Sequence, residues 1–134
     1  MPIQVRILAS HRLLVMSGEG DVSITELREA QARVQTDAEF DPTLNQLIDA
    51  RRVANFDGSL TDVKEVAARS LMAQSSRRVM LLPPGFIYVL GRMFAAYSGL
   101  QGRETFVFDA LDEAAGCLGM DPGALRRLVD EPHD

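Results

Sequence analysis

Hydrophobic and polar positions follow two periodicities along the chain, one typical of strands and the other of helices. Residues 3–7 alternate apolar and polar side chains, which predicts a strand with one buried face. Residues 10–12 predict a turn and residues 13–16 a second strand, so we expect an N-terminal antiparallel hairpin. The run Ser-Gly-Glu-Gly at 17–20 is expected to end the second strand.

Two helix starts are marked by capping residues. Ser23 is followed three positions later by Glu26, a capping-box pattern, and then by apolar residues at helical spacing. Residues 51–58 are expected to be a connection. After it, either Ser59 or Thr61 begins a second helix.

Three further strands are predicted at residues 44–50, 79–82 and 105–108. The segment 79–82 is continuously apolar, which indicates a strand buried on both faces, the usual state of a parallel strand. A third helix is expected over about residues 84–98, because proline is well tolerated in a first helical turn.

The C-terminal part predicts two more helices. Asp109 is expected to cap a fourth helix that ends at Gly119, and Asp121 to cap a short helix over residues 122–129. Residues 130–134 are polar and are expected to fray.

The resulting order of strands and helices predicts an α/β fold. We expect a mostly parallel sheet of about five strands, an N-terminal antiparallel hairpin and four or five helices. At 134 residues the chain has the length of one domain, so residues 1–134 are expected to form a single domain. Its core is expected at about residues 3–119, with a tail at 120–134.

Composition argues against a nucleic-acid partner. The formal net charge is -5, whereas binding to a phosphate backbone needs a basic surface. The arginine pairs at 51–52, 77–78 and 126–127 are scattered, and we interpret each as a solvated strand or helix end. We also expect no membrane span and no signal peptide, because no window approaches the ~20 apolar residues that a span requires.

Cys117 is the single cysteine, which excludes a disulfide within the chain and fits a cytoplasmic protein. It lies in an apolar stretch and is expected to be a small buried hydrophobe. With His11 and His133 the only histidines, we expect no metal site and no Cys–His pair. Phosphate-loop, dinucleotide and serine-hydrolase motifs are also missing, so we expect neither a cofactor nor an enzyme.

The chain resembles the SpoIIAA-like family, which belongs to the wider STAS group, from about residue 3 to residue 118. The Gly-Arg-Met-Phe run of the third helix is the most specific feature of the likeness. The segments that carry the resemblance are 46–53 with Phe56-Asp57, the strand into Leu82-Pro83-Pro84-Gly85, the helix 88–94, and the strand-to-helix segment 107–114.

The resemblance implies an α/β fold and a role in regulation or protein interaction without catalysis. SpoIIAA is a partner-switching protein with a serine at a helix start that its partner kinase phosphorylates. The corresponding candidates here are Ser59 and Thr61, although Gly58 precedes Ser59, unlike the family's Asp-x-Ser-Gly order. The alternative is that either residue serves only as an N-cap.

The third helix is apolar nearly all round, and three explanations stay open. It could pack in the core, form an interface with a partner or a second copy, or line a cavity for an apolar ligand. Arg92 on this helix is expected to pair with Asp109 or Asp112, with binding of a ligand carboxylate as the alternative. The candidate ligand or interface residues are Tyr88, Arg92, Met93, Phe94 and Tyr97.

Two functions follow from these patterns. The leading hypothesis is a non-enzymatic regulatory module that docks a protein partner or self-associates, with Ser59 as a potential phosphorylation switch. The alternative is a small carrier that binds an apolar or acyl ligand near the third helix.

Overall fold

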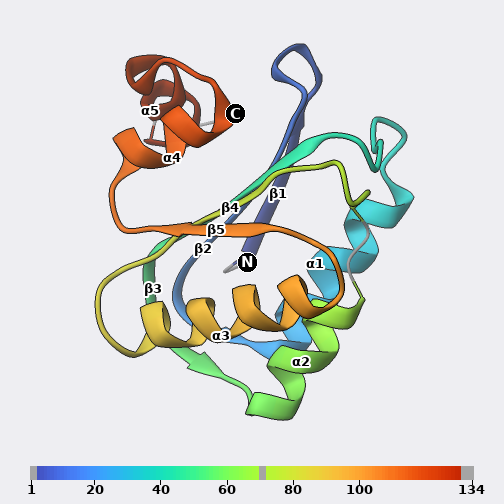
Figure 1. The fold of residues 1–134 in the computed structure, drawn as a ribbon, viewed down its shortest axis with the longest axis vertical. Coiled ribbons are helices and arrows are strands. Elements are labelled where there is room, and N and C mark those ends of the chain that lie inside the picture. Colours follow the sequence, from blue (N-terminus) through green and yellow to red (C-terminus); the bar gives the residue numbers. More distant parts are fainter. Residues whose placement is uncertain (1–2, 70–71, 131–134) are drawn as a thin grey trace.

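The structure of the protein is a computed structural model that describes residues 3–69 and 72–130. These residues form a sheet with helices on both of its faces (Figure 1). The elements are β1 (Ile3–Leu8), the 3₁₀ helix η1 (Ala9–His11), β2 (Leu13–Ser23), α1 (Ile24–Thr36), β3 (Asn45–Asp57), α2 (Leu60–Ala68), β4 (Arg78–Leu81), α3 (Phe86–Leu100), β5 (Thr105–Phe108), α4 (Leu111–Leu118) and α5 (Pro122–Asp130).

The five strands lie in the order β1-β2-β3-β4-β5. β1 pairs antiparallel with β2, and the other neighbours pair parallel, so the α/β fold with an N-terminal hairpin is confirmed. Each parallel connection steps to the next strand in the same direction. Since such crossovers are right-handed, α1, α2 and α3 share one face, while α4 and α5 cover the other (Figure 1).

The hairpin forms where the sequence predicts it. η1 closes the turn, and Arg12 follows in the left-handed conformation with φ 52°. Leu8 then pairs with Leu13 and Ile3 with Gly18. The polar residues at 10–12 are exposed, as expected for a turn.

β2 and β3 are much longer than the sequence predicts. The expected end of β2 at residues 17–20 and the expected connection at 51–58 are both wrong, because the two segments pair with each other as far as Ser23 and Asp57. Two register shifts, between Ser17 and Glu19 and between Gly20 and Asp21, each give β3 one extra residue. Such bulges bend a strand pair. In Figure 1 the extension accordingly curves past α3.

The two faces of the sheet bury alternate residues of each strand. Val79 and Leu81 pack in a cluster with α4 and α5, whereas Met80 faces the helices of the opposite side. All four residues of β4 are buried, which confirms the predicted strand with two buried faces. Leu125 of α5 is 0% exposed within the first cluster, so the core extends past its expected boundary at residue 119.

The ends of the helices follow mostly from local capping. Ser23 Oγ accepts a hydrogen bond from Glu26 N at 3.2 Å, and Ala124 N donates to the Asp121 carboxylate at 3.0 Å, as their positions predict. Gly119 ends α4 with φ 69°, a conformation that favours glycine. The expected cap at Asp109 is wrong, because Ala110 occupies the N-cap position of α4.

Candidate functional site

An apolar cavity lies between the sheet and the helices α1, α2 and α3. Its volume is about 170 Å³, whereas one water molecule needs about 10–15 Å³ measured in the same way. The space therefore exceeds an ordinary packing defect. The described lining residues are Ile3, Leu14, Met16, Ser17, Gly18, Val22, Ile24, Leu27, Gln31, Val34, Gln46, Ile48, Asp49, Ala50, Val53, Phe56, Val63, Val66, Met72, Arg78, Met80, Leu82, Ile87, Leu90, Gly91 and Phe94.

The curved extension of β2 and β3 supplies one wall of the cavity. Val22, Val53 and Phe56 come from this extension and pack with Leu27 of α1. The two bulges bend the strand pair, and the bent extension brings these side chains against α1. The cavity thus depends on the part of the fold that the sequence patterns did not predict.

Helix α3 approaches the sheet closely at Gly91. A Cβ atom at this position would lie 2.0 Å from Leu82 Cδ1, so a larger residue would force Leu82 to move. Ile87, Leu90 and Phe94 surround Gly91 on the same helix and face the cavity with it. The glycine therefore sets how near this apolar helix lies to β4.

A row of polar side chains crosses the sheet beside the cavity. Gln46, Arg78 and Thr105 are register partners on β3, β4 and β5, and adjacent partners point to the same face. Arg78 Nε donates to Gln46 Oε1 at 3.2 Å. Its Nη1 donates to Ser98 Oγ of α3 at 3.3 Å, and its guanidinium lies 5.2 Å from the Phe94 ring centroid. Strand β4 thus carries a cation into the interior.

Burial disfavours the protonated form of Arg78, but the side chain keeps its positive charge. Arg78 is 6% exposed, and desolvation, together with the nearby charge of Arg103, lowers the pKa of Arg78 to about 10. The side chain is still a cation at neutral pH. Beside it, Arg103 Nε and Thr105 Oγ1 are buried without a hydrogen-bond partner among the described residues. The surroundings of Arg78 are therefore electropositive and contain further donors.

The candidate residues of α3 do not lie together. Phe94 lines the cavity, whereas Tyr88 and Met93 are half-buried outside the described lining. The Tyr97 ring faces α2, where Lys64 Nζ lies 5.1 Å from its centroid. The helix accordingly shows both a cavity-facing side and an outer side.

The expected ion pair of Arg92 is wrong. Arg92 is exposed and has no ion pair with the described carboxylates, and Asp112 pairs instead with Arg126 at 3.4 Å. Asp109 and Asp112 lie where β5 passes into α4, on the opposite face from α3 in Figure 1. The sheet separates Arg92 on α3 from Asp109 and Asp112, which are near α3 in sequence only. This separation explains why the predicted ion pair does not form.

Arg78 is the residue that sequence reasoning missed, since its interpretation as a solvated strand end is wrong. Arg77 is exposed, but Arg78 is the first residue of β4 and is buried. A usable signal was present. Arg78, Met80 and Leu82 alternate, and in a strand that is buried on both faces the first of them also points inward.

Ser59 serves as the N-cap of α2. Its Oγ accepts from Asp62 N at 3.1 Å, and Asp62 Oδ2 accepts from Ser59 N at 2.8 Å, a reciprocal capping box. These bonds, with the charge of Arg28 at 3.4 Å, lower the pKa of Asp62. Ser59 and Thr61 are both exposed, and Ser59 is the cap among the two sequence candidates.

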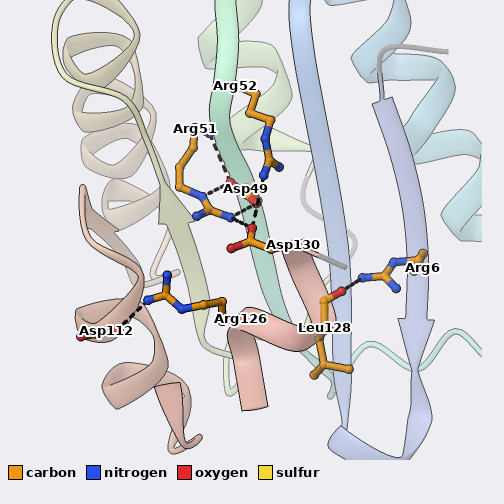
Figure 2. Close-up of polar contacts among 8 residues, drawn as sticks. All are labelled: Arg6, Asp49, Arg51, Arg52, Asp112, Arg126, Leu128 and Asp130. Carbon is orange, nitrogen blue, oxygen red and sulfur yellow. Dashed lines mark hydrogen bonds and ion pairs between the residues drawn. The ribbon is translucent and has the colours of Figure 1, made fainter. Parts of the chain in front are cut away.

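A second polar cluster fastens α5 to the sheet on the face opposite the cavity (Figure 2). Asp49 accepts from Arg51 Nε at 3.0 Å and from Arg51 Nη2 at 2.9 Å. Arg51 Nη2 also donates to Asp130 at 2.6 Å, and Arg6 donates to the carbonyl of Leu128. The bonds to Asp49 and Asp130 raise the pKa of Arg51. We interpret this cluster as a structural clamp, since its charges neutralise one another.

The remaining sulfur and carboxylate groups form no further centre in the part of the chain that the structure describes. Cys117 is half-buried against the core cluster, and burial raises the pKa of its thiol. Within that part, no three His, Cys, Asp or Glu side chains are placed to hold a metal ion. No helix there has the length and apolar character needed to cross a bilayer.

Comparison with known proteins gives the fold. A solved structure, described as an uncharacterized protein from the DUF3478 family with a SpoIIAA-like fold from Shewanella loihica PV-4, is similar to this chain. The match has a TM-score of 0.58 and covers 87% of this chain and 91% of the other, at 11% identity. No family model and no curated protein matches the chain. At this identity the likeness shows the fold alone, and the expected SpoIIAA-like fold is confirmed.

Proposed function

We propose that this protein is a non-enzymatic carrier that binds an apolar small molecule in the cavity between the sheet and α1–α3. The observation that carries the proposal is the cavity itself, about 170 Å³ and lined mainly by aliphatic and aromatic side chains. Concave sites lined mainly by apolar side chains, with a few polar groups among them, are the usual binding sites of small molecules. The carrier that the sequence left as an alternative is thus the function that the geometry supports best.

The expected energetics are adequate for binding. Each buried methylene group contributes roughly 0.8 kcal/mol, so about ten of them correspond to roughly 8 kcal/mol, the free energy of a micromolar complex. The entropic cost of association reduces this sum. An aliphatic chain of moderate length is therefore the natural occupant.

The polar lining residues favour binding over catalysis. Among the described ones, Asp49 is the sole carboxylate, and Arg51 binds it on the other face of the sheet. Ser17 lacks a histidine or lysine beside it in the lining that would activate its hydroxyl as a nucleophile. These groups can orient a ligand, and the chemistry of a reaction is not assembled around them.

A fluorescence titration tests the proposal. The neutral probe N-phenyl-1-naphthylamine should bind the full chain with enhanced emission, and Ile48→Trp should abolish this binding by filling the cavity. Ala54→Trp is the matched control, since Ala54 is exposed on the same strand and lies outside the described lining. Probe binding that Ile48→Trp leaves unchanged, in a variant that remains folded by circular dichroism, would contradict a carrier role for this cavity.

A second candidate is the regulatory module that docks a protein partner, favoured by the outer face of α3. Phe86, Val89 and Leu100 are 69%, 54% and 85% exposed there, a concentration of apolar surface on one helix. Ser59 is exposed at the start of α2, where a helix N-terminus stabilises an added phosphate.

The test of this second candidate combines affinity capture with light scattering. Capture of one defined protein that Val89→Asp abolishes would support a docking module. A dimer that Val89→Asp dissociates would support self-association instead. A monomer that captures nothing would leave the carrier as the proposed function.

A further inference from the structure

We propose that the occupant of the cavity is an amphiphile with an anionic end, an aliphatic carboxylate in the simplest case, and that Arg78 holds this end. The inference rests on the proposed carrier function and specifies its ligand class. The observations that carry it are the position of Arg78 in the cavity wall, the nearby charge of Arg103, and the donors that surround them.

Arg78 lies at a defined place in the cavity. It belongs to the lining together with Phe94, whose ring centroid lies 5.2 Å from its guanidinium, and with Met80, which points to the same face of β4. Hydrogen bonds to Gln46 and Ser98 hold the guanidinium from β3 and from α3. The cation is therefore positioned beforehand, and an anion would add to these contacts instead of displacing a flexible surface side chain.

The charge balance of the cavity selects an anion. Asp49 is the single acid in the described lining, and its carboxylate is bound by Arg51 on the opposite face, toward α5 (Figure 2). Burial disfavours the protonated form of Arg78, and the nearby charge of Arg103 disfavours it further. A carboxylate at this point would offset both effects, whereas an ammonium group would add a further positive charge.

Two unsatisfied donors lie near Arg78. Arg103 Nε and Thr105 Oγ1 are buried without a described hydrogen-bond partner, and Thr105 is the register neighbour of Arg78 on β5. Buried donors of this kind are costly unless a partner satisfies them. A carboxylate has two oxygens that accept such bonds, and an arginine fork matches its geometry.

The experiment compares three probes that differ only in their polar end: dodecanoate, 1-dodecanol and dodecylamine. Each displaces N-phenyl-1-naphthylamine from the full chain, at concentrations below its micelle or solubility limit. Dodecanoate should bind about tenfold or more tightly than 1-dodecanol, and dodecylamine should bind most weakly. Equal binding of dodecanoate and 1-dodecanol would overturn the inference.

Variants assign the preference to one residue. Arg78→Gln should lower the affinity for dodecanoate to that for 1-dodecanol and leave 1-dodecanol unchanged. Arg92→Gln is the matched control, because it removes one positive charge from the exposed side of α3, and it should keep the preference. A preference that survives Arg78→Gln would overturn the role of Arg78.

The outcomes separate this inference from the function on which it rests. If no probe binds, the carrier function itself fails. If 1-dodecanol binds and Ile48→Trp abolishes its binding, but dodecanoate binds no better, the carrier stands and the anionic ligand is wrong. Should Arg78→Gln fail to fold, Arg78→Lys is measured with the same three probes. Lysine keeps the charge and loses the planar fork, so the preference for dodecanoate over 1-dodecanol should fall, and an unchanged preference would overturn the role of Arg78.

Discussion

Asp130, the last described residue of α5, accepts a hydrogen bond from Arg51 Nη2 of β3 at 2.6 Å (Figure 2). Arg51 is also bound to Asp49, which is 3% exposed, and so one guanidinium joins the C-terminal helix to the middle of the sheet. Through this contact and the buried Leu125, a segment that the sequence suggests is peripheral becomes part of the core.

Replacing Leu125 by alanine should reduce the free energy of unfolding by roughly 2–5 kcal/mol, the usual cost of a buried leucine truncation. The physical reason is the cavity left in the α4–α5 cluster, where Leu125 is fully buried. Urea denaturation measures the change. Leu100→Ala, at a position 85% exposed, is the control and should stay within about 0.5 kcal/mol of the wild type. A loss that is equally small for Leu125 would show that α5 is not docked.

Removing the clamp carboxylate with Asp130→Ala should cost about 1 kcal/mol of unfolding free energy, because Arg51 keeps its bonds to Asp49. Asp112→Ala is the comparison. Its pair with Arg126 is exposed on both sides, and such pairs contribute roughly 0–1 kcal/mol, toward the lower end when exposed. Urea midpoints of the two variants decide, and a larger loss for Asp112→Ala would contradict the clamp.

The stability that Asp130 contributes should depend on pH. Partial burial opposes ionisation, but the bonds and charges of Arg51 and Arg52 outweigh it and hold the pKa of Asp130 below its ordinary value. A carboxyl group with a lower pKa in the folded state stabilises the fold above its unfolded pKa of about 3.9. This contribution is lost as the pH falls through the folded value.

Wild type and Asp130→Asn should therefore differ in urea midpoint at pH 7 and converge below about pH 4. The comparison cancels the titration of other carboxyl groups that both proteins share. A difference that is constant from pH 7 to pH 3 would argue against an ionised Asp130 in the clamp.

Ser59→Ala should destabilise the protein by about 1 kcal/mol, since it removes the acceptor of the α2 capping box. Ser59→Asp should retain most of the stability, because aspartate is also a good N-cap. The negative charge of Asp62, three residues away, works against this substitution. Thr61→Ala is the control. Thr61 is exposed and makes no described side-chain hydrogen bond, so it should change little. Thermal unfolding ranks the three variants, and an equal loss for Thr61→Ala would be inconsistent with the assigned cap.

Local patterns predicted much of the architecture. The alternation at residues 3–7, the apolar run at 79–82 and the caps at Ser23 and Ser59 each lie within one segment, and each element formed where its pattern indicated. Glycine at 119 ended a helix for an equally local reason, its left-handed conformation.

The candidate site was predicted only in part. Phe94 lines the cavity, but Arg92 and Tyr97 lie on other sides of α3. An apolar helix has no polar face to reveal which side meets the sheet, and so periodicity could not orient it. Gly91 determines how closely α3 approaches Leu82, but a hydrophobicity pattern does not distinguish this glycine from any other.

By itself the sequence determined the order of strands and helices, because backbone propensity, capping and side-chain alternation act between residues near in the chain. Tertiary structure alone decided the extension of β2 and β3 and the cavity that this extension helps to enclose. The physical reason is that strand pairing joins backbone groups whatever the side chains are, and burial depends on which distant elements cover a residue.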